Sequence, residues 1–572
     1  MATTGKAHVR IALGIGALLV SSGCYRGSDG AAEGGASGTE GDDDGADDGA
    51  DGAPDPFCEE DTLPGKLSRF VRLTHRQYDN TVKALLTVDT TPAAEFLNDA
   101  AIGGFNNNAD QLLVNNNLAR DYRRAAEQLG DALVTDSARL ASLLPCTPDA
   151  DPDGCAAMFI AQFGHRAFRR PLTSEEQAQF EGLYQTGGGL YESGSDFEQG
   201  ISFVVEAFLQ APSFLYRSEL TPAGEGQDVV ALSGYEIASR LSYMMWNSMP
   251  DDELFAAAEA GMLDDAQGVQ AQARRMLEDP RAADPIEDFH QQWLGMSKYA
   301  SLSKDPDMFP EFVPGMADSM QAETLAFARN TILTNDGTFT DLMTSTDSYV
   351  DERLAPLYGL EGEFGPELTP VSLDPAQRAG FLTHIGFLAG NAYFAGTSPI
   401  HRGVFVQRQV MCTTIPDPPG DADLELPPFD EELTTTRQRV EHHTSADACQ
   451  GCHSVINEPG FAFEGYDAIG VLRTEENGVT VDTQGSFATP DGEMEFTDAV
   501  DMIHKIAESP QAQRCYLTQW FRYASSRTET VDDLCSLNGM HENLVEGDYN
   551  VKELLVSLTR TVSFRYRNTV EE

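Results

Sequence analysis

The stretch RLTHRQYDNTVKALL, from Arg72 to Leu86, predicts the fold class of the chain. Thr74 stands three residues before Gln77, and this spacing is typical of a capping box, in which each side chain bonds the backbone N–H of the other residue. Apolar side chains then follow at helical spacing, at Tyr78, Val82 and Leu85. A helix with one apolar stripe must bury that stripe against other elements, so the stretch indicates a packed helical domain.

The same pattern recurs further along the chain. RRPLTSEEQAQFEGLY (169–184) pairs Thr173 with Glu176, and ALSGYEIASRLSYMMW (231–246) pairs Ser233 with Glu236. Helical periodicity also covers residues 286–294, 316–333, 377–388, 496–507, 512–524 and 551–562. A chain of 572 residues is too long for one compact domain. We therefore predict a mainly α protein made of several consecutive helical modules.

Strand-like alternation is scarce in the sequence. The best stretch is GVLRTEENGVTVDTQGSF (470–487), where Asn477-Gly478 is a typical turn of a two-stranded hairpin. No nucleophile elbow, phosphate-binding loop or zinc-protease helix occurs in the chain. We therefore expect one small β-hairpin and assign no catalytic residue.

The first 24 residues predict export. Lys6 and Arg10 precede an apolar run from Ile11 to Val20, and small residues follow it, as in a secretory signal. The run is too short to cross a bilayer as a helix. The end at Gly23-Cys24 resembles a bacterial lipobox, with Ser21 where leucine is usual. We expect lipidation of Cys24 and a membrane-anchored lipoprotein in the periplasm or on the outer surface; the alternative is an ordinary signal peptide cleaved near this cysteine.

The charge of the chain restricts its partners. Residues 25–62 contain almost no large apolar side chain and many Asp residues, which predicts a disordered acidic tether. The whole chain has 91 acidic and 38 basic residues, a formal net charge of −53. Such a surface repels nucleic acid and anionic headgroups and attracts basic proteins, or it serves solubility in a salty habitat. We expect no nucleic-acid partner, and membrane contact only through the lipid anchor.

The pentapeptide CQGCH, from Cys449 to His453, has three possible interpretations. C-x-x-C-H is typical of haem c attachment, in which two thiols one helical turn apart bond the porphyrin and the adjacent imidazole binds the iron. A zinc site needs two more thiols or imidazoles at similar spacing, and the chain has no second C-x-x-C. A thioredoxin-like redox pair needs a βαβ context that is missing. Since haem c is assembled outside the cytoplasm, export favours covalent haem c on Cys449 and Cys452, with His453 as the proximal ligand.

Six cysteines remain when Cys24, Cys449 and Cys452 are set aside. An oxidising compartment favours disulfides among them, although six cysteines allow many connectivities. We expect a short loop across TPDADPDG, a bond between C-terminal helices, and a third bond by elimination. The predicted pairs are Cys146–Cys155, Cys515–Cys535 and Cys58–Cys412.

The order of these segments resembles that of exported multi-domain proteins of planctomycetes and myxobacteria. Their families are the planctomycete cytochrome C-like group and domains of unknown function 1587, 1595, 1592, 1588 and 1585. Besides the helical stretches quoted above, the matching segments are RAGFLTHIGFLAGNAYFAGTSPIHRGVFVQRQVMCTTIPDPP (378–419) and CQGCHSVINEPGFAFEGYDAIGVLR (449–473). The usual family pattern places Asp-Pro-x-Gly-Phe after the pentapeptide, whereas this chain has Asn-Glu-Pro-Gly-Phe at 457–461. The resemblance implies export and haem, and no defined reaction.

These signals divide the chain into seven expected segments. They are a signal peptide (1–24), the acidic tether (25–62), an N-terminal helical module (63–145), a second helical module (146–222), a central helical module (223–370), a cytochrome c-like module with the C-x-x-C-H motif (371–490) and a C-terminal helical module (491–572).

The second axial ligand of the iron is open at this level. The candidates are His443, His442, Met411, Met494, Met502 and His504. The family's pattern often places a histidine six residues before the first thiol, which favours His443; the alternative for this residue is a cap or hydrogen-bond donor at the start of the haem helix. Methionine ligation gives a higher reduction potential than histidine ligation.

The functional hypothesis is an exported, lipid-anchored c-type haem protein that exchanges electrons with a redox partner protein, and the acidic surface favours a basic partner. One alternative is a haem-dependent oxidoreductase with a second substrate site. Another is a surface binding or scaffold protein in which the pentapeptide is structural. Five histidines in or beside helices are expected to be packing or capping residues rather than ligands: His75, His165, His290, His384 and His401.

Overall fold

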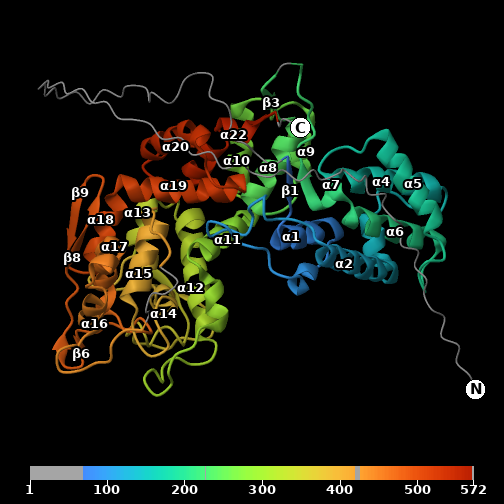
Figure 1. Ribbon diagram of the computed structural model, residues 1–572. Helices are drawn as coiled ribbons and strands as arrows, with labels where there is room; N and C mark the ends of the chain where they lie inside the picture. Colours follow the sequence, from blue (N-terminus) through green and yellow to red (C-terminus); the bar gives the residue numbers. More distant parts are fainter. Residues whose placement is uncertain (1–68, 226, 419–424, 570–572) are drawn as a thin grey trace, which may run out of the picture.

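The computed structural model describes residues 69–225, 227–418 and 425–569 (Figure 1). Helices account for 55% of the chain and strands for 8%, which confirms the prediction of a mainly α protein. In the described ranges the strands pair only as two-stranded antiparallel sheets. No helix in these ranges is long and apolar enough to cross a bilayer.

The N-terminal helices pack around a core of their own. The helices α2 and α6 lie side by side, and the strand β1 pairs with β2. The core consists mainly of aromatic and aliphatic side chains such as Tyr78, Phe159 and Phe208, all fully buried. The elements are β1 (Phe70–Arg72), α1 (His75–Leu86), α2 (Asn116–Thr135), α3 (Ser137–Leu143), α4 (Pro152–Phe168), α5 (Ser174–Thr186), α6 (Asp196–Gln210), α7 (Pro212–Leu215) and β2 (Tyr216–Ser218).

The rest of the described chain shares a second, larger core, which contains Trp246, Trp293 and Trp520. Figure 1 shows α4 to α6 at one end of the molecule, α15 to α18 at the other, and α8 between them. The first elements of this part are β3 (Val229–Ala231), α8 (Gly234–Trp246), α9 (Asp252–Glu259), α10 (Ala266–Leu277), α11 (Ala283–Trp293), α12 (Met316–Arg329), α13 (Phe339–Thr344), β4 (Asp347–Val350), β5 (Thr369–Ser372), α14 (Ile385–Gly390) and α15 (Pro399–Phe405).

The C-terminal elements complete this second core. The strand β10 pairs with β3, so the end of the described chain returns to the point where this part begins. The elements are α16 (Thr436–His443), α17 (Asp447–Phe461), β6 (Glu475–Glu476), β7 (Val479–Thr480), β8 (Gly485–Thr489), β9 (Gly492–Phe496), α18 (Ala499–Glu508), α19 (Pro510–Ser525), α20 (Leu534–Glu546), α21 (Val551–Leu558), α22 (Val562–Arg565) and β10 (Tyr566–Asn568).

The predicted local signals form as expected. Reciprocal capping boxes begin α1 at Thr74, α5 at Thr173 and α8 at Ser233. The predicted hairpin is β6–β7, and its turn residues Asn477 and Gly478 have φ values of 50° and 79°. Both values lie in the left-handed region, which asparagine and glycine adopt most readily, so this turn is specified locally.

The helix predicted over residues 377–388 is wrong in its first half. Gly380 has φ 51° and ψ −165°, and a Cβ at this position would lie 2.2 Å from the carbonyl oxygen of Met343. The close approach of another segment therefore holds the backbone out of the helical conformation. The α-helix α14 begins only at Ile385.

Glu323 of α12 is fully buried in the second core. Its carboxyl accepts hydrogen bonds from the hydroxyls of Ser348 at 2.6 Å and Tyr358 at 2.5 Å. Burial outweighs these bonds and raises the pKa of Glu323 to about 7. The folded protein therefore holds a proton on this carboxyl at a pH at which the unfolded chain has lost it.

Replacing Glu323 by glutamine is expected to change the pH dependence of stability. A raised folded-state pKa stabilises the native chain fully below the unfolded pKa of 4.5, and this stabilisation is lost as the pH rises to about 7. Between pH 4.5 and pH 7, the unfolding free energy of Glu323→Gln should therefore increase by about 3 kcal/mol relative to that of the native chain. Denaturant midpoints measured at several pH values test this, and a difference independent of pH would contradict it.

Candidate functional site

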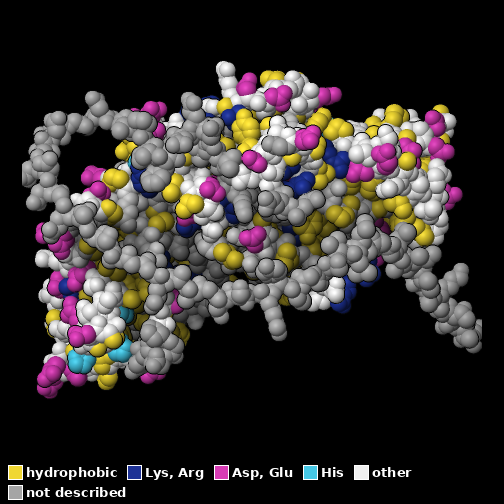
Figure 2. All heavy atoms as spheres, turned by 45° about the horizontal axis from the view of Figure 1, so that its top comes forward, with side chains coloured by type: hydrophobic (Ala, Val, Ile, Leu, Met, Phe, Trp, Pro, Cys, Tyr) yellow, Lys and Arg dark blue, Asp and Glu magenta, His cyan; other side chains and the backbone are white. Residues whose placement is uncertain are grey.

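The pentapeptide lies on the N-terminal half of α17. Cys449, Cys452 and His453 stand at positions i, i+3 and i+4 of the helix, so the three side chains share one face. All three are half-buried, whereas Ile456 and Phe461 in the C-terminal half are buried. Figure 2 shows histidine side chains gathered at the end of the molecule where Figure 1 places α16. The helix is therefore held by its C-terminal half and presents its thiols and imidazole close to solvent.

Glycines let α17 cross α15 with backbone contact. A Cβ on Gly403 of α15 would lie 1.9 Å from the carbonyl oxygen of Ile456, and a Cβ on Gly460 would lie 2.0 Å from that of Pro399. Only glycine permits such an approach, so both positions exclude any larger residue. This crossing packs the C-terminal half of α17 on the core, along the same helical face that carries the thiols in the N-terminal half.

A chain of hydrogen bonds orients the ring of His453. The hydroxyl of Thr444 donates to the carbonyl oxygen of Val440 at 2.8 Å and accepts from Nδ2 of Asn457 at 2.9 Å. Oδ1 of Asn457 therefore faces Nδ1 of His453, at 2.9 Å. Because this oxygen can only accept, the network assigns the proton of the neutral imidazole to Nδ1. The lone pair is then on Nε2, which is the arrangement a metal-ligating histidine requires.

The two thiols of α17 differ from the other cysteines of the described chain. Cys449 and Cys452 are free. The other described cysteines are all in disulfides: Cys146, Cys155, Cys412, Cys515 and Cys535. The structure thus keeps a pair of thiols available on one helical face while the rest are oxidised.

Two of the predicted disulfides are wrong. The structure bonds Cys146 to Cys155, which is the pair expected from the short loop between them. It also bonds Cys412 to Cys515, which excludes both Cys515–Cys535 and Cys58–Cys412. Cys412 follows α15 by a few residues, and α19 packs against that segment, so two parts separated by 103 positions meet here. Pairing the remaining cysteines by elimination could not predict this contact, because the contact depends on tertiary packing.

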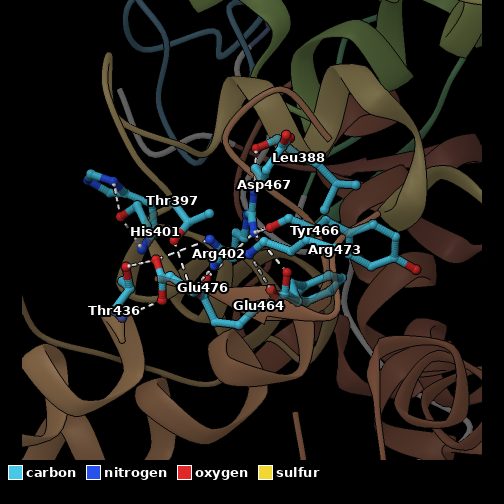
Figure 3. Close-up of polar contacts among 12 residues, drawn as sticks. Leu388, Thr397, His401, Arg402, Thr436, Glu464, Tyr466, Asp467, Arg473 and Glu476 are labelled. Atoms are coloured by element: carbon cyan, nitrogen blue, oxygen red, sulfur yellow. Dashed lines mark hydrogen bonds and ion pairs between the residues drawn. The ribbon is translucent and has the colours of Figure 1, made fainter. Parts of the chain in front are cut away.

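Arg402 of α15 is the centre of a buried polar network behind the helix crossing (Figure 3). Its side chain has no exposed surface, and its guanidinium lies 3.8 Å from the carboxylate of Glu464. Burial lowers the pKa of Arg402 to about 10, and burial raises the pKa of Glu464. The guanidinium also donates to four backbone carbonyls, those of Leu388, Phe463, Tyr466 and Asp467. This arginine therefore joins α14, α15 and the segment after α17.

Arg473 extends the network toward α16. It pairs with Glu464 at 2.8 Å and with Glu476 at 3.1 Å. Glu476 in turn accepts from the backbone N–H and the hydroxyl of Thr436, the first residue of α16. The network thus fixes α16 against the hairpin that follows α17, and its role is to hold the scaffold of the thiol-bearing helix.

Comparison with protein families places these elements in a known order. Sequence models of five families match consecutive segments, each described as a protein of unknown function: DUF1587 at 72–135, DUF1595 at 155–219, DUF1592 at 232–360, DUF1588 at 378–476 and DUF1585 at 491–564. The chain belongs to the planctomycete cytochrome-like proteins. No curated protein and no solved structure matches the chain.

The DUF1588 segment of this cytochrome-like protein contains the pentapeptide, the crossing helix α15 and the Arg402 network. Among its described residues no three Cys, His, Asp or Glu side chains converge on a point at which they could hold a metal ion. A haem iron differs from such a centre because the porphyrin supplies four ligands and the protein adds one or two. His453 has the geometry of one of these.

The candidates for the second axial ligand lie in different surroundings. Met411 and Met502 are buried in the second core, Met494 lies on β9 and packs against it, and His504 is exposed on α18. His442 and His443 end α16, which packs against α17, and His443 precedes Thr444 of the hydrogen-bond chain. Cys24, Cys58 and the acidic tether lie outside the described residues.

The structure adds residues that sequence reasoning missed. Asn457 and Thr444 hold the ring of His453; the only signal for Asn457 was its place one helical turn after the histidine. Arg402 gave no signal, since a single arginine in a polar turn is usually exposed. Of the helix-associated histidines, His290 is buried against Ile286 and Tyr516, as expected for a packing residue.

Proposed function

We propose that the chain is an exported c-type haem protein that carries electrons. The observation that carries this proposal is the face of α17, where two free thiols one turn apart precede an imidazole whose Nδ1 is held by Asn457. The cytochrome-like family assignment supports it.

The residues present fit haem c. Cys449 and Cys452 would bond the two vinyl groups, and Nε2 of His453 would bind the iron. When bound, haem c supplies a one-electron redox couple. Asn457 keeps the imidazole oriented, and the Arg402 network keeps α17 fixed, so little rearrangement of the protein is needed on electron transfer. The half-buried position of the thiols leaves this face accessible to a partner.

Export and anchoring are part of the proposal. The signal-like first 24 residues end at Cys24, whose lipidation would tie the chain to a membrane through the acidic segment 25–62. The net charge of −53 would attract a redox partner with a basic surface and speed their encounter at low salt. His443 is the favoured second axial ligand, because α16 packs against α17.

The proposal is tested by producing the full chain in a host with a cytochrome c maturation system. We expect a Soret band and a covalent haem stain that survives denaturation. The variant Cys449→Ala/Cys452→Ala should lose the stain entirely, whereas the matched variant Cys146→Ala/Cys155→Ala should keep it. Wild-type protein without stain and without Soret absorbance would refute the proposal. A reduced spectrum that resists carbon monoxide indicates two protein ligands, and one that shifts indicates an open site.

Replacing Asn457 by aspartate is expected to lower the reduction potential of the haem. A carboxylate accepts more strongly from Nδ1 of His453 than an amide does, which makes the imidazole a better donor and favours the oxidised iron. The expected shift is on the order of tens of millivolts, with an unchanged haem stain. Redox titration of the two proteins measures it, and Asn457→Leu should shift the potential in the opposite direction. Equal potentials in all three proteins would show that Asn457 does not orient the ligand.

A further inference from the structure

A cavity of about 90 Å³ lies where β2, α8, the end of α19 and α22 meet, far along the chain from the pentapeptide. These elements come from the segments matched by DUF1595, DUF1592 and DUF1585, near the middle of the molecule in Figure 1. One water molecule needs about 10–15 Å³ of such a cavity, so this cavity has room for roughly six atoms of the size of a water molecule. It is large enough for a small molecule.

Polar atoms in the lining lack partners among the described residues. Four buried atoms make no hydrogen bond there: Nε of Arg217, Nε of Arg527, Oε2 of Glu219 and Oγ of Ser239. Native proteins leave few such atoms, because each one costs about 1–3 kcal/mol when unpaired. Two of these atoms can only donate and one, the carboxylate oxygen, can only accept. A ligand that satisfied the set would need acceptor oxygens together with at least one O–H or N–H.

The charges favour an anion beside Arg217. Glu219 already pairs with Arg240 at 2.6 Å, and Arg527 pairs with Asp533 at 2.6 Å. In the described chain Arg217 forms a hydrogen bond only to Oγ of Ser526, at 3.1 Å, and no ion pair. The charged groups near its guanidinium are the carboxylate of Glu219, which is bonded to Arg240, and the guanidinium groups of Arg240 and Arg169.

The surroundings of Arg217 explain why this charge is costly. Arg217 and Arg169 both lie over the ring of Tyr243, at 5.5 and 5.6 Å from its centroid. Burial lowers the pKa of Arg217 to about 10, so it is still protonated at neutral pH. Glu236, a further carboxylate in the lining, is occupied by hydrogen bonds from Thr221 and Ser233, and Asp110 is exposed. The carboxylate of Glu219 is shared between Arg217 and its ion-pair partner Arg240, so a second anion would offset the cost of burying Arg217.

We propose that this cavity binds hydrogen phosphate. Its acceptor oxygens match Nε of Arg217 and of Arg527, its P–O–H group matches Oε2 of Glu219, and Oγ of Ser239 can pair with either. Its five heavy atoms fit the volume. Sulfate has similar size and charge but no proton at neutral pH, so it would place an oxygen against the carboxylate of Glu219. The site therefore distinguishes the two ions by one hydrogen bond.

Calorimetric titration of the full chain with inorganic phosphate tests this, with sodium sulfate at matched ionic strength as the comparison. We expect saturable 1:1 binding of phosphate and at least tenfold weaker binding of sulfate. Arg217→Met should weaken phosphate binding about tenfold or more, because it removes the charged donor. Ser239→Ala, which preserves packing, should weaken it a few-fold. Arg560→Met makes the same charge change at an exposed position and should bind as the native chain does.

Several results would overturn the proposal. They are the absence of saturable phosphate binding, equal binding of phosphate and sulfate, or native affinity in both Arg217→Met and Ser239→Ala. If Arg217→Met does not fold, the phosphate affinity of Ser239→Ala and the comparison with sulfate decide whether the proposal holds. A glycerol 3-phosphate titration separates the source of the phosphate group, since binding as tight as that of inorganic phosphate would contradict a site for the free ion. Haem takes no part in these measurements, so their failure bears on the cavity alone.

Discussion

Replacing Arg402 by methionine is expected to remove about 3–5 kcal/mol of stability or to prevent the second core from folding. Methionine replaces the apolar stem of the side chain but leaves four backbone carbonyls without their donor and the buried carboxylate of Glu464 with Arg473 as its remaining cation. Removing one partner of a buried ion pair lowers the free energy of unfolding far more than removing a surface pair, because the remaining charge stays out of water. Denaturant unfolding followed by tryptophan fluorescence measures the loss.

Arg408→Met is the matched control for this prediction. Arg408 lies on the same segment, is only half-buried, and pairs with Asp417, whose side chain is 89% exposed. Its loss should cost less than about 1 kcal/mol, as for other exposed pairs. If Arg402→Met gives no soluble protein, Glu464→Gln tests the same network more gently and should cost about 1–3 kcal/mol. Similar stability in Arg402→Met and Arg408→Met would show that the network does not hold α15 to α17.

Local physics made much of the fold predictable from the sequence. The capping boxes at Thr74, Thr173 and Ser233 form within four residues of chain, so their outcome depends on few other contacts. The Asn477-Gly478 turn is specified in the same way by two residues that tolerate positive φ. The pentapeptide is also local, because residues at i, i+3 and i+4 share a helical face whatever the helix packs against.

The features that were predicted wrongly, or not predicted at all, depend on contacts with distant parts of the chain. Gly380 leaves the helical conformation because the backbone of Met343 lies against it, and nothing near residue 380 encodes that neighbour. Arg402 is buried because two distant segments offer it carbonyl oxygens at one point, which a single sequence does not reveal. The cavity beside Arg217 arises where four separately matched segments meet. Asn457 is intermediate: its spacing from His453 is local, while its orientation comes from Thr444, the residue that follows α16.

Removing the disulfide between Cys412 and Cys515 by a double alanine substitution is expected to destabilise the protein by about 5 kcal/mol. The bond closes a loop across 103 positions and joins the segment after α15 to α19. In the chain-entropy account, a cross-link stabilises mainly by restricting the unfolded chain, and the effect grows with loop length. The bond also links the DUF1588 segment to the DUF1585 segment, so the effect should appear in the unfolding of the second core.

Cys146→Ala/Cys155→Ala is the control, because the same chemistry closes a sequence separation of only 9. Its expected cost is about 3 kcal/mol, roughly 2 kcal/mol less than for the long loop. Thermal and denaturant midpoints of the two variants give the comparison, and peptide mapping of the unreduced native chain tests the connectivity directly. A mapped Cys515–Cys535 bond would show that the pairing is wrong. Equal losses in the two variants would instead show that strain or packing around the buried Cys515, and not loop length, determines what the bond contributes.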